Sequence, residues 1–218
     1  MNRKFKHIFC YVIFGILFSF CSNSKIRNGI NDNIINMQQL DSNIAILGGG
    51  CFWCVEAQLQ QLDGVDTMIS GYSGGTKVNP TYQEVCTGNT GHAEVCKIIF
   101  DENKISYKDL LYAFFTAHDP TTFNRQGDDI GTQYRSVIFY INDAQKQIAN
   151  EVISDLTSRK IFDNPIVTEV KPLSVFYPAE NYHQNYYNLN SGENYCRFVI
   201  SPKLNKFRKE YISKLKQK

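Results

Sequence analysis

The sequence predicts an α+β domain, a split βαβ (ferredoxin-like) two-layer sandwich in which helices pack on a mixed sheet and further elements are added. Short apolar runs of strand length alternate with longer segments whose apolar residues recur every three or four positions. Their order is β-α-β-β-α-β, followed by one more helix and strand. The chain has 218 residues, 43% of them hydrophobic and 20% charged, which excludes a disordered or collagen-like chain.

The first half of the pattern contains a strand, a tight turn, a helix and a second strand. Residues 44–47 form a short apolar run that ends in three glycines, which is typical of a buried strand entering a tight turn. Residues 52–62 carry apolar side chains at helical spacing, and residues 65–69 read as the next strand. A loop rich in glycine and tyrosine follows over residues 71–92.

The second half repeats the alternation with longer helices. We expect strands at 94–100, 136–141 and 166–175, helices at 107–117 and 144–157, and a helix or loop at 178–187. Residues 118–134 lie between a helix and a strand and lack either periodicity. A loop of that length inside a small domain is usually functional.

The sharpest local feature is a pair of cysteines, Cys51 and Cys54, between a predicted strand and a predicted helix. A cysteine at a helix N-terminus faces unpaired N–H groups and the positive end of the helix dipole, so a thiolate is favoured there. The second cysteine lies about one turn further, within reach of a disulfide. We therefore expect Cys51 to attack a substrate and Cys54 to resolve the product.

Three other interpretations of this pair stay open. The two cysteines could be packed core residues, or a thioredoxin-like disulfide exchanger could use the same spacing. A zinc site with His92 and Glu94 is disfavoured, because the order of the two motifs is the reverse of that in zinc deaminases and their proline is missing. Phe52 and Trp53 would form an apolar wall that suits a small apolar substrate group better than a peptide disulfide.

Four segments together resemble the peptide-methionine (S)-S-oxide reductases, the MsrA family. They are GGGCFWC, TYQEVCTGNTGHAEV, HDPTTFNRQGDDIGTQYRS and AENYHQNYY, which follow one another between residues 48 and 187. The resemblance extends over about residues 43–209. It implies reduction of the S epimer of methionine sulfoxide, free or in proteins, with no metal or bound cofactor and with thioredoxin or a similar thiol donor as reductant.

The resemblance also assigns roles to residues. It implies that Cys51 attacks the sulfoxide and becomes a sulfenic acid, a reversible oxidation state of the thiol. Glu94 matches the acid of the family, Phe52 and Trp53 its methyl pocket, Tyr82 and Tyr134 the phenols that hold the sulfoxide oxygen, and Asp129 a polar residue near the substrate main chain or the nucleophile. Without the motif, each has an ordinary structural role: His92 as a loop hydrogen-bonder, for example, and Asp129 as a turn residue. His183 is interpreted as structural.

The chain departs from the family pattern at Cys54, where many members carry glycine and recycle through cysteines near the C-terminus. No cysteine follows Cys196. We expect Cys54 to resolve the sulfenic acid, with Cys196 as the rival. Cys86, Cys96 and Cys196 are otherwise expected to be buried packing thiols in or beside strands.

The two ends of the chain differ from its body. Residues 1–20 begin with basic side chains and continue with thirteen almost wholly apolar residues, too few to span a bilayer comfortably, which indicates a secretory signal. The residues before Cys21 resemble a bacterial lipoprotein signal, so lipidation at Cys21 is one expectation; ordinary cleavage and a retained anchor are the alternatives. We expect an exported, periplasmic or membrane-anchored protein, with a cytoplasmic location as the alternative.

The expected organisation is then a linker at 21–42, a catalytic domain at 43–210 and a basic tail at 211–218. The basic residues after 200 favour a solvated helix end, so we expect no nucleic-acid partner. Oxidised proteins are the expected substrates and a monomer the expected state. An exported enzyme would need a thiol donor relayed across the membrane. Two other functions compete: a general disulfide exchanger, and a surface lipoprotein without catalytic activity.

Overall fold

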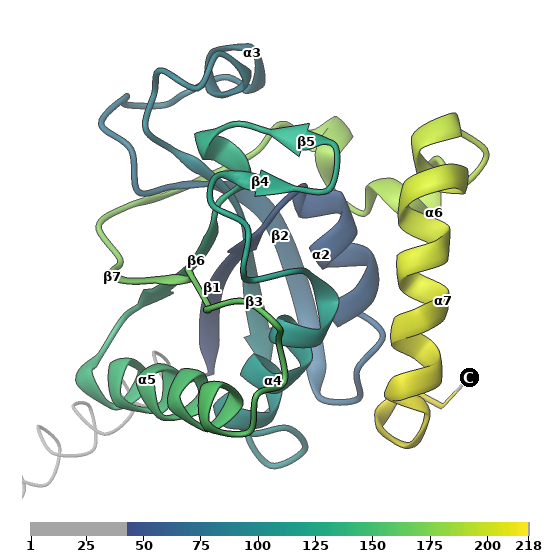
Figure 1. Ribbon diagram of the computed structural model, residues 1–218. Coiled ribbons are helices and arrows are strands. Elements are labelled where there is room, and N and C mark those ends of the chain that lie inside the picture. Colours follow the sequence, from purple (N-terminus) through teal and green to yellow (C-terminus); the bar gives the residue numbers. More distant parts are fainter. Residues whose placement is uncertain (1–42, 218) are drawn as a thin grey trace, which may run out of the picture. The chain divides into compact units, whose positions relative to one another are not determined.

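The computed structural model (Figure 1) describes residues 43–217, which contain a six-stranded sheet and a small separate hairpin. The strands of the large sheet lie in the order β7-β6-β1-β3-β2-β8. They are β1 (Ile44–Gly49), β2 (Val65–Ser73), β3 (Ala93–Phe100), β6 (Ser136–Tyr140), β7 (Glu169–Pro172) and β8 (Phe176–Pro178). β7 runs parallel to β6, and every other neighbouring pair is antiparallel. The prediction of an α+β fold with a mixed sheet is confirmed.

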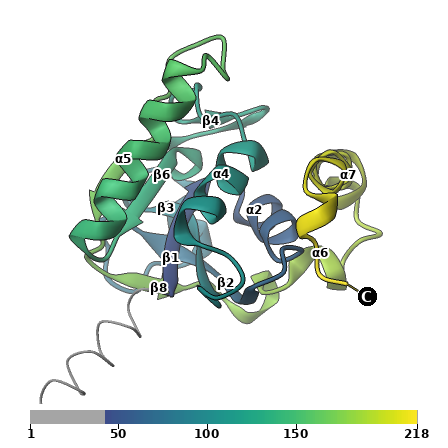
Figure 2. The same cartoon turned by 90° about the horizontal axis from the view of Figure 1, so that it is seen from below.

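Four longer helices and two short ones accompany the sheet. They are α2 (Phe52–Leu59), α3 (Tyr82–Cys86), α4 (Tyr107–Ala117), α5 (Asp143–Ser158), α6 (Tyr186–Leu189) and α7 (Ser201–Glu210). Polar side chains begin several of them: Ser106 caps α4, Asn142 caps α5, and Thr81 and Glu84 form a capping box on α3. Helix α2 packs against α4 and α7, and α7 lies beside α2 in both views (Figures 1 and 2).

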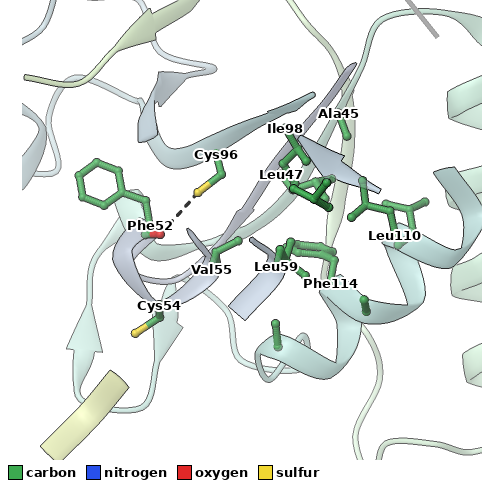
Figure 3. Packing of buried hydrophobic residues seen from close by; sticks show 14 of the residues in the cluster. Ala45, Leu47, Phe52, Cys54, Val55, Leu59, Cys96, Ile98, Leu110 and Phe114 are labelled. Carbon is green, nitrogen blue, oxygen red and sulfur yellow. Dashed lines mark hydrogen bonds between the residues drawn. The ribbon is translucent and has the colours of Figure 1, made fainter. Parts of the chain in front are cut away.

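The main core lies between the sheet and helices α2 and α4. Alternate residues of β3 face it, and Leu47 of β1, Leu59 of α2 and Phe114 of α4 meet there (Figure 3). A smaller cluster around Ile46, Val95 and Phe139 covers the opposite face of the sheet. Glu94 lies in the alternating pattern of β3 on the side of the main core, which places its carboxyl beneath the start of α2.

Three predicted segments differ from the structure. The loop expected at 71–92 contains helix α3, and β2 extends into it as far as Ser73. The strand expected at 166–175 is shorter, β7, and β8 follows after a break, because the alternation predicts strands but not where the chain changes its pairing partner from β6 to β2. The loop at 118–134 contains the hairpin of β4 (Arg125–Gln126) and β5 (Asp129–Ile130) and a 3₁₀ turn at Thr132–Tyr134.

The C-terminal segment is also more ordered than the sequence predicts. A π-helical turn at Cys196–Ile200 leads directly into α7, whose Leu204 and Phe207 are buried. A 3₁₀ turn follows at Ile212–Lys214, in the segment expected to be a basic tail. This segment forms backbone hydrogen bonds with the residues after α2: the Lys216 N–H donates to the Gln61 carbonyl at 2.9 Å, and the Asp63 N–H donates to the Lys214 carbonyl at 2.9 Å. Two buried apolar side chains therefore anchor a helix that its charge alone would make a solvated end.

The predictions for residues 1–42, namely the signal, the lipid site at Cys21 and the linker, lie outside the described residues. Within residues 43–217, none of the helices has the length and apolar character needed to cross a membrane.

A buried histidine secures the end of β1. His118 Nδ1–H donates to the Phe114 carbonyl at 2.8 Å, and Nε2 accepts from the Ser136 hydroxyl at 2.7 Å, which in turn accepts from Thr168 at 2.7 Å. A Cβ at Gly49 would lie 2.9 Å from this ring, so only glycine fits there. Burial lowers the pKa of His118 to about 4 and keeps the ring neutral.

We therefore expect acid to destabilise the protein through His118. The unfolded histidine binds a proton near pH 6.5 and the folded one only near pH 4, so this contribution is complete above pH 6.5 and is lost as the pH falls toward 4. The loss over that window is on the order of 3 kcal/mol. Urea unfolding of the wild type and of His118→Gln should show free energies that converge as the pH falls from 6.5 to 4. A difference that does not vary with pH would contradict this account.

Candidate active site

Cys51 sits where β1 passes into α2, and glycines make that passage possible. Gly50 has a φ of +88°, a conformation that favours glycine, and a Cβ there would lie 2.5 Å from Gln126 Cγ. A Cβ on Gly48 would lie 2.7 Å from the Glu94 carbonyl oxygen. The glycines thus let the turn press against β3, and they hold the largely buried Cys51, 6% exposed, at the N-cap of α2.

Glu94 lies directly under this turn. The Phe52 N–H donates to its carboxyl at 3.0 Å, and the side chain is only 2% exposed. Burial raises the pKa of Glu94 to about 8, and the nearby Asp129 and Cys54 act in the same direction, while the bond from Phe52 opposes them. The carboxyl is therefore mostly neutral at pH 7 and can donate a proton, as its assignment as an acid requires.

A cluster of aromatic rings forms around Phe52, the residue whose N–H bonds this carboxyl. Phe52 lies 6.0 Å from Trp53 and is stacked with Tyr82 at 6.5 Å, measured between ring centroids. His183 lies among the same rings, 5.0 Å from Phe52 and 4.4 Å from Tyr82. Tyr186 stacks on Trp53 at 3.7 Å with the ring planes 8° apart. Phe52, Trp53 and Tyr82 are thus brought together as predicted, and His183 packs within their cluster.

The phenols of Tyr82 and Tyr134 stay protonated near neutral pH. Burial raises the pKa of each above the usual value, and negative charge at Glu94 acts on both in the same direction. Tyr134 also responds to Cys51 and Asp129. These shared influences place both hydroxyls in the neighbourhood of Glu94 as hydrogen-bond donors.

The two thiols of the turn interact with each other. Burial raises the pKa of Cys51 well above its usual value, and the neighbouring Cys54 thiol acts in the same direction. The Cys51 thiol in turn lowers the pKa of Cys54, and the Lys203 ammonium acts in the same direction. The expectation of a thiolate at Cys51 is therefore wrong, because burial favours the thiol. The first N–H groups of α2 serve elsewhere: Phe52 bonds Glu94, and Cys54 and Val55 bond the Cys51 carbonyl.

Tyr195 is a site residue that sequence reasoning missed. Its hydroxyl donates to Asp129 Oδ2 at 2.9 Å and lies 4.0 Å from Cys54 Sγ, and negative charge at Cys51 or Cys54 raises the pKa of the phenol further above the value that burial gives it. The ring meets Trp53 edge-on, with centroids 5.9 Å apart. Asp129 thus holds Tyr195 over the thiols. One tyrosine among 13 gives no signal of this role except its position next to Cys196.

A second missed residue, Glu56, orders the segment that covers the site. Glu56 is buried on α2 and accepts from the backbone N–H groups of Asn185 at 2.9 Å and Tyr186 at 3.2 Å. Nearby, Glu180 accepts from the Tyr72 hydroxyl and the Tyr82 N–H, both at 2.9 Å. These two carboxylates fix the ring of Tyr186 on Trp53 and the start of α3 near the site.

The other cysteines occupy distinct places. Cys96 on β3 is buried and donates to the Phe52 carbonyl at 3.5 Å, while Cys54 points away from it (Figure 3). Cys196 is buried as predicted, but it begins a helical turn, and its pKa is raised by burial and by the charge of Cys54. Cys86 ends α3 and is exposed, so the prediction of a buried strand thiol is wrong there. The capping box of Thr81 and Glu84 begins a short helix where a loop was expected, and this helix ends with Cys86 at the surface.

His92 and the cavities lie apart from this chemistry. His92 accepts from the Gly75 N–H at 3.1 Å and donates to the Lys77 carbonyl at 2.8 Å, the role of a loop hydrogen-bonder. Residues 43–217 contain no group of three His, Cys, Asp or Glu side chains placed to hold a metal ion. A groove of about 700 Å³ between α4 and α7 includes Lys203 in its lining but neither Cys51 nor Glu94.

Comparison with known proteins gives one consistent family. The family model of peptide methionine sulfoxide reductase matches residues 43–216. The peptide methionine sulfoxide reductase MsrA of Deinococcus radiodurans is 55% identical over 172 residues, which cover 79% of this chain and 84% of that protein. The MsrA of Chromobacterium violaceum is 54% identical over 167 residues, 77% of this chain and 95% of that protein.

Solved structures are similar as well. The reduced form of Mxr1 from Saccharomyces cerevisiae is 34% identical, with a TM-score of 0.66 over 70% of this chain and 88% of that one. Methionine sulfoxide reductase A of Corynebacterium diphtheriae is 33% identical, with a TM-score of 0.60 over 68% of this chain and 74% of that one.

We predict that Glu94→Gln stabilises the fold increasingly as the pH rises. The folded carboxyl keeps its proton to about pH 8 and the unfolded one only to about 4.5, so its contribution is full below pH 4.5 and is lost as the pH rises through 8. The amide keeps the acceptor for Phe52 without titrating. Urea unfolding between pH 4.5 and 9 should show a gain on the order of 5 kcal/mol relative to the wild type. A gain equal at all pH values would show that the wild-type carboxyl has an ordinary pKa.

Proposed function

The chain belongs to the peptide methionine sulfoxide reductase family, and we propose that it reduces the S epimer of methionine sulfoxide, in proteins and as the free amino acid, to methionine. It is an oxidoreductase that acts through thiols. The observation that carries the proposal is the neutral, buried carboxyl of Glu94 beside the Cys51 turn and beneath an aromatic wall. Together they supply a nucleophile, a proton donor and an apolar surface, the three requirements of sulfoxide reduction.

The first step transfers oxygen from the substrate to the enzyme. The sulfur of Cys51 attacks the sulfoxide sulfur, so that an S–S bond forms transiently, and its proton passes to Cys54, whose pKa is lowered. Glu94 gives its proton to the sulfoxide oxygen while Tyr82 and Tyr134 donate hydrogen bonds to it. The oxygen then moves to Cys51 Sγ as a hydroxyl: the new S–O bond forms, the transient S–S bond and the S–O bond of the substrate break, and methionine leaves. Cys51 becomes a sulfenic acid, so the thiol is oxidised by two electrons and the sulfoxide reduced by two.

The chirality of the substrate follows from fixed positions around the sulfur. The methyl group packs on Phe52 and Trp53, the oxygen points to Glu94 and the phenols, and Cys51 approaches from the turn. With these three directions set, the remaining substituent leads outward for only one epimer. The other epimer would place its oxygen on the aromatic wall and leave the neutral carboxyl unused.

Recycling proceeds through Cys54 in our proposal. The support is that Cys54 lies in the first turn of the helix that Cys51 caps and that it influences the pKa of Cys51. Negative charge at Cys54 raises the pKa of Cys196, so these two thiols are near each other. Cys196 is not among the groups that shift the pKa of Cys51. The Cys51–Cys54 disulfide then needs a two-electron thiol donor, and we propose thioredoxin or a thioredoxin-like protein. Oxidised proteins are the proposed substrates, so the enzyme repairs them.

We also propose that residues 1–20 export the protein and that Cys21 carries a lipid, with residues 21–42 as a tether. The support is the basic start of the chain, the apolar run before Cys21 and the polar residues after it. The domain would then act in the periplasm or at a membrane and draw electrons from a donor relayed across it.

Two structural proposals accompany this function. We assign the core to a split βαβ (ferredoxin-like) arrangement, supported by β3 lying between β1 and β2 and by β1 lying between β3 and β6. We also propose that the protein acts as a monomer; the support is that the site residues contact one another within the chain, as Tyr195 does with Asp129 and Lys203 with Cys54.

The proposed activity predicts a strict epimer preference. Purified protein is mixed with racemic N-blocked methionine sulfoxide and dithiothreitol, and chiral chromatography measures both epimers over time. Only the S epimer should be consumed. Cys51→Ser should abolish the activity, because a hydroxyl replaces the only sulfur placed to attack. Reduction of protein disulfides without loss of either epimer would instead establish a general disulfide exchanger.

The proposed recycling predicts different behaviour for two cysteine variants. With thioredoxin as reductant, Cys54→Ser should lose steady-state turnover by about 100-fold, while Cys196→Ser should retain turnover within about threefold. Both should still release one methionine per enzyme in a single turnover, because Cys51 is intact. The reverse pattern would make Cys196 the resolving thiol.

The proposed export predicts the chemistry of the mature N-terminus. Mass spectrometry of the protein from a membrane fraction should find a chain that begins at a diacylated Cys21. An unmodified Met1 in the soluble fraction would contradict the export proposal, and a cleaved chain without lipid would contradict the anchor alone.

A further inference from the structure

Lys203 is a charged residue of the site that neither the motifs nor the proposed chemistry uses. It lies in the first turn of α7, is half-buried, and points its ammonium at Cys54 with Nζ 3.9 Å from Sγ. Within residues 43–217, this sulfur is the only polar partner of the ammonium. Asp119, Asp163 and Glu210 line the same groove, but among the described residues none of them forms an ion pair with Lys203. A half-buried lysine whose ammonium lies against a thiol is positioned to stabilise negative charge on that thiol.

We propose that Lys203 is a positioning residue for recycling, which holds Cys54 as the thiolate that attacks the sulfenic acid of Cys51. The proposal deepens the proposed function and rests on it, because it concerns the second step at the same pair of cysteines. It gives α7, which packs against α2, a role in the chemistry beyond that of a packing element.

The Cys54 sulfur attacks Cys51 Sγ, the S–S bond forms, and the S–O bond of the sulfenic acid breaks. The oxygen leaves with its own proton and the proton that Cys54 has given up, as water. Cys54 is oxidised and the sulfenic sulfur is reduced. Only the thiolate of Cys54 attacks efficiently, so any group that favours the thiolate accelerates this step.

Several titratable groups near Cys54 favour or oppose its thiolate. Negative charge at Asp129 or Glu94 opposes the thiolate, and burial opposes it as well. The Cys51 thiol favours it, but this influence changes once Cys51 is a sulfenic acid, and the Tyr195 hydroxyl, 4.0 Å from Cys54 Sγ, donates its proton to Asp129. Cys196 is the remaining thiol nearby. Lys203 is the cation among these groups, so its contribution persists through the step that needs it.

The groove between α4 and α7 provides a matched control. Lys203 and Lys206 both line it, three residues apart on α7, but Lys206 is exposed and makes no contact with Cys54. Replacing Lys206 removes one positive charge from the same helix and leaves the thiol untouched.

The test follows one turnover of the reduced full chain without reductant. Enzyme is mixed with one equivalent of S-methionine sulfoxide, samples are quenched with dimedone, and mass spectrometry counts the dimedone adduct of Cys51 and the Cys51–Cys54 disulfide. Released methionine is measured in the same samples, so the first step is monitored separately from the second. The variants are Lys203→Met, Lys203→Gln, Lys203→Arg and Lys206→Met, and circular dichroism checks that each folds.

We expect Lys203→Met and Lys203→Gln to release methionine with the wild-type yield but to form the disulfide about tenfold more slowly at pH 7, since a neighbouring charge shifts a thiol pKa by one unit or more. Raising the pH to 9.5 should restore most of that rate, and Lys203→Arg should stay within about twofold of the wild type. Lys206→Met should be unchanged.

Disulfide formation at the wild-type rate in both neutral variants would overturn the proposal. So would a slow rate that neither high pH nor arginine restores, because that pattern belongs to a structural role. A wild-type enzyme that releases no methionine would overturn the proposed function itself, and one that forms a Cys51–Cys196 disulfide would overturn the recycling step on which Lys203 acts.

Discussion

The hydrogen bond from the Phe52 N–H to the Glu94 carboxyl is the contact on which the site depends. It joins the first residue of α2 to the core side of β3, and it can form only because glycines let the chain turn closely over the strand. One bond therefore places the nucleophile at the N-cap, the aromatic wall in the first turn of the helix and the acid beneath both. The burial that the turn imposes also keeps the acid neutral.

The second half of the chain completes this arrangement from outside. Glu56 and Glu180 fix backbone segments near the aromatic rings, and Tyr195, held by Asp129, covers the thiols. These contacts connect residues more than 60 positions apart, so the site exists only in the folded domain. They also surround Cys51 and Cys54, which are almost wholly buried, with polar and aromatic side chains.

Apolar periodicity predicted the strands of the large sheet and the longer helices before residue 160, but not α3 or the hairpin of β4 and β5, which lie in segments expected to be loops. The motifs singled out Cys51, Phe52 and Glu94, and the roles they assign to these residues stay predictions. The structure brings those predicted residues together. Periodicity could not predict where β7 ends or that α7 packs, because both depend on long-range partners. Tyr195, Glu56 and Lys203 were missed for the same reason: each acquires its role from a contact with a distant residue. The prediction of a thiolate at Cys51 was wrong because burial raises the pKa of this thiol, an effect that the position at a helix N-terminus does not reveal.

The central claim is that Glu94 is a neutral acid beside Cys51 in the resting enzyme. Infrared difference spectroscopy between the wild type and Glu94→Gln observes this proton directly, through the carbonyl stretch of a protonated carboxyl. The account predicts that this band is present at pH 7 and disappears with a midpoint near pH 8. A spectrum that shows only carboxylate at pH 7 would contradict it, and would require another proton donor for the sulfoxide oxygen.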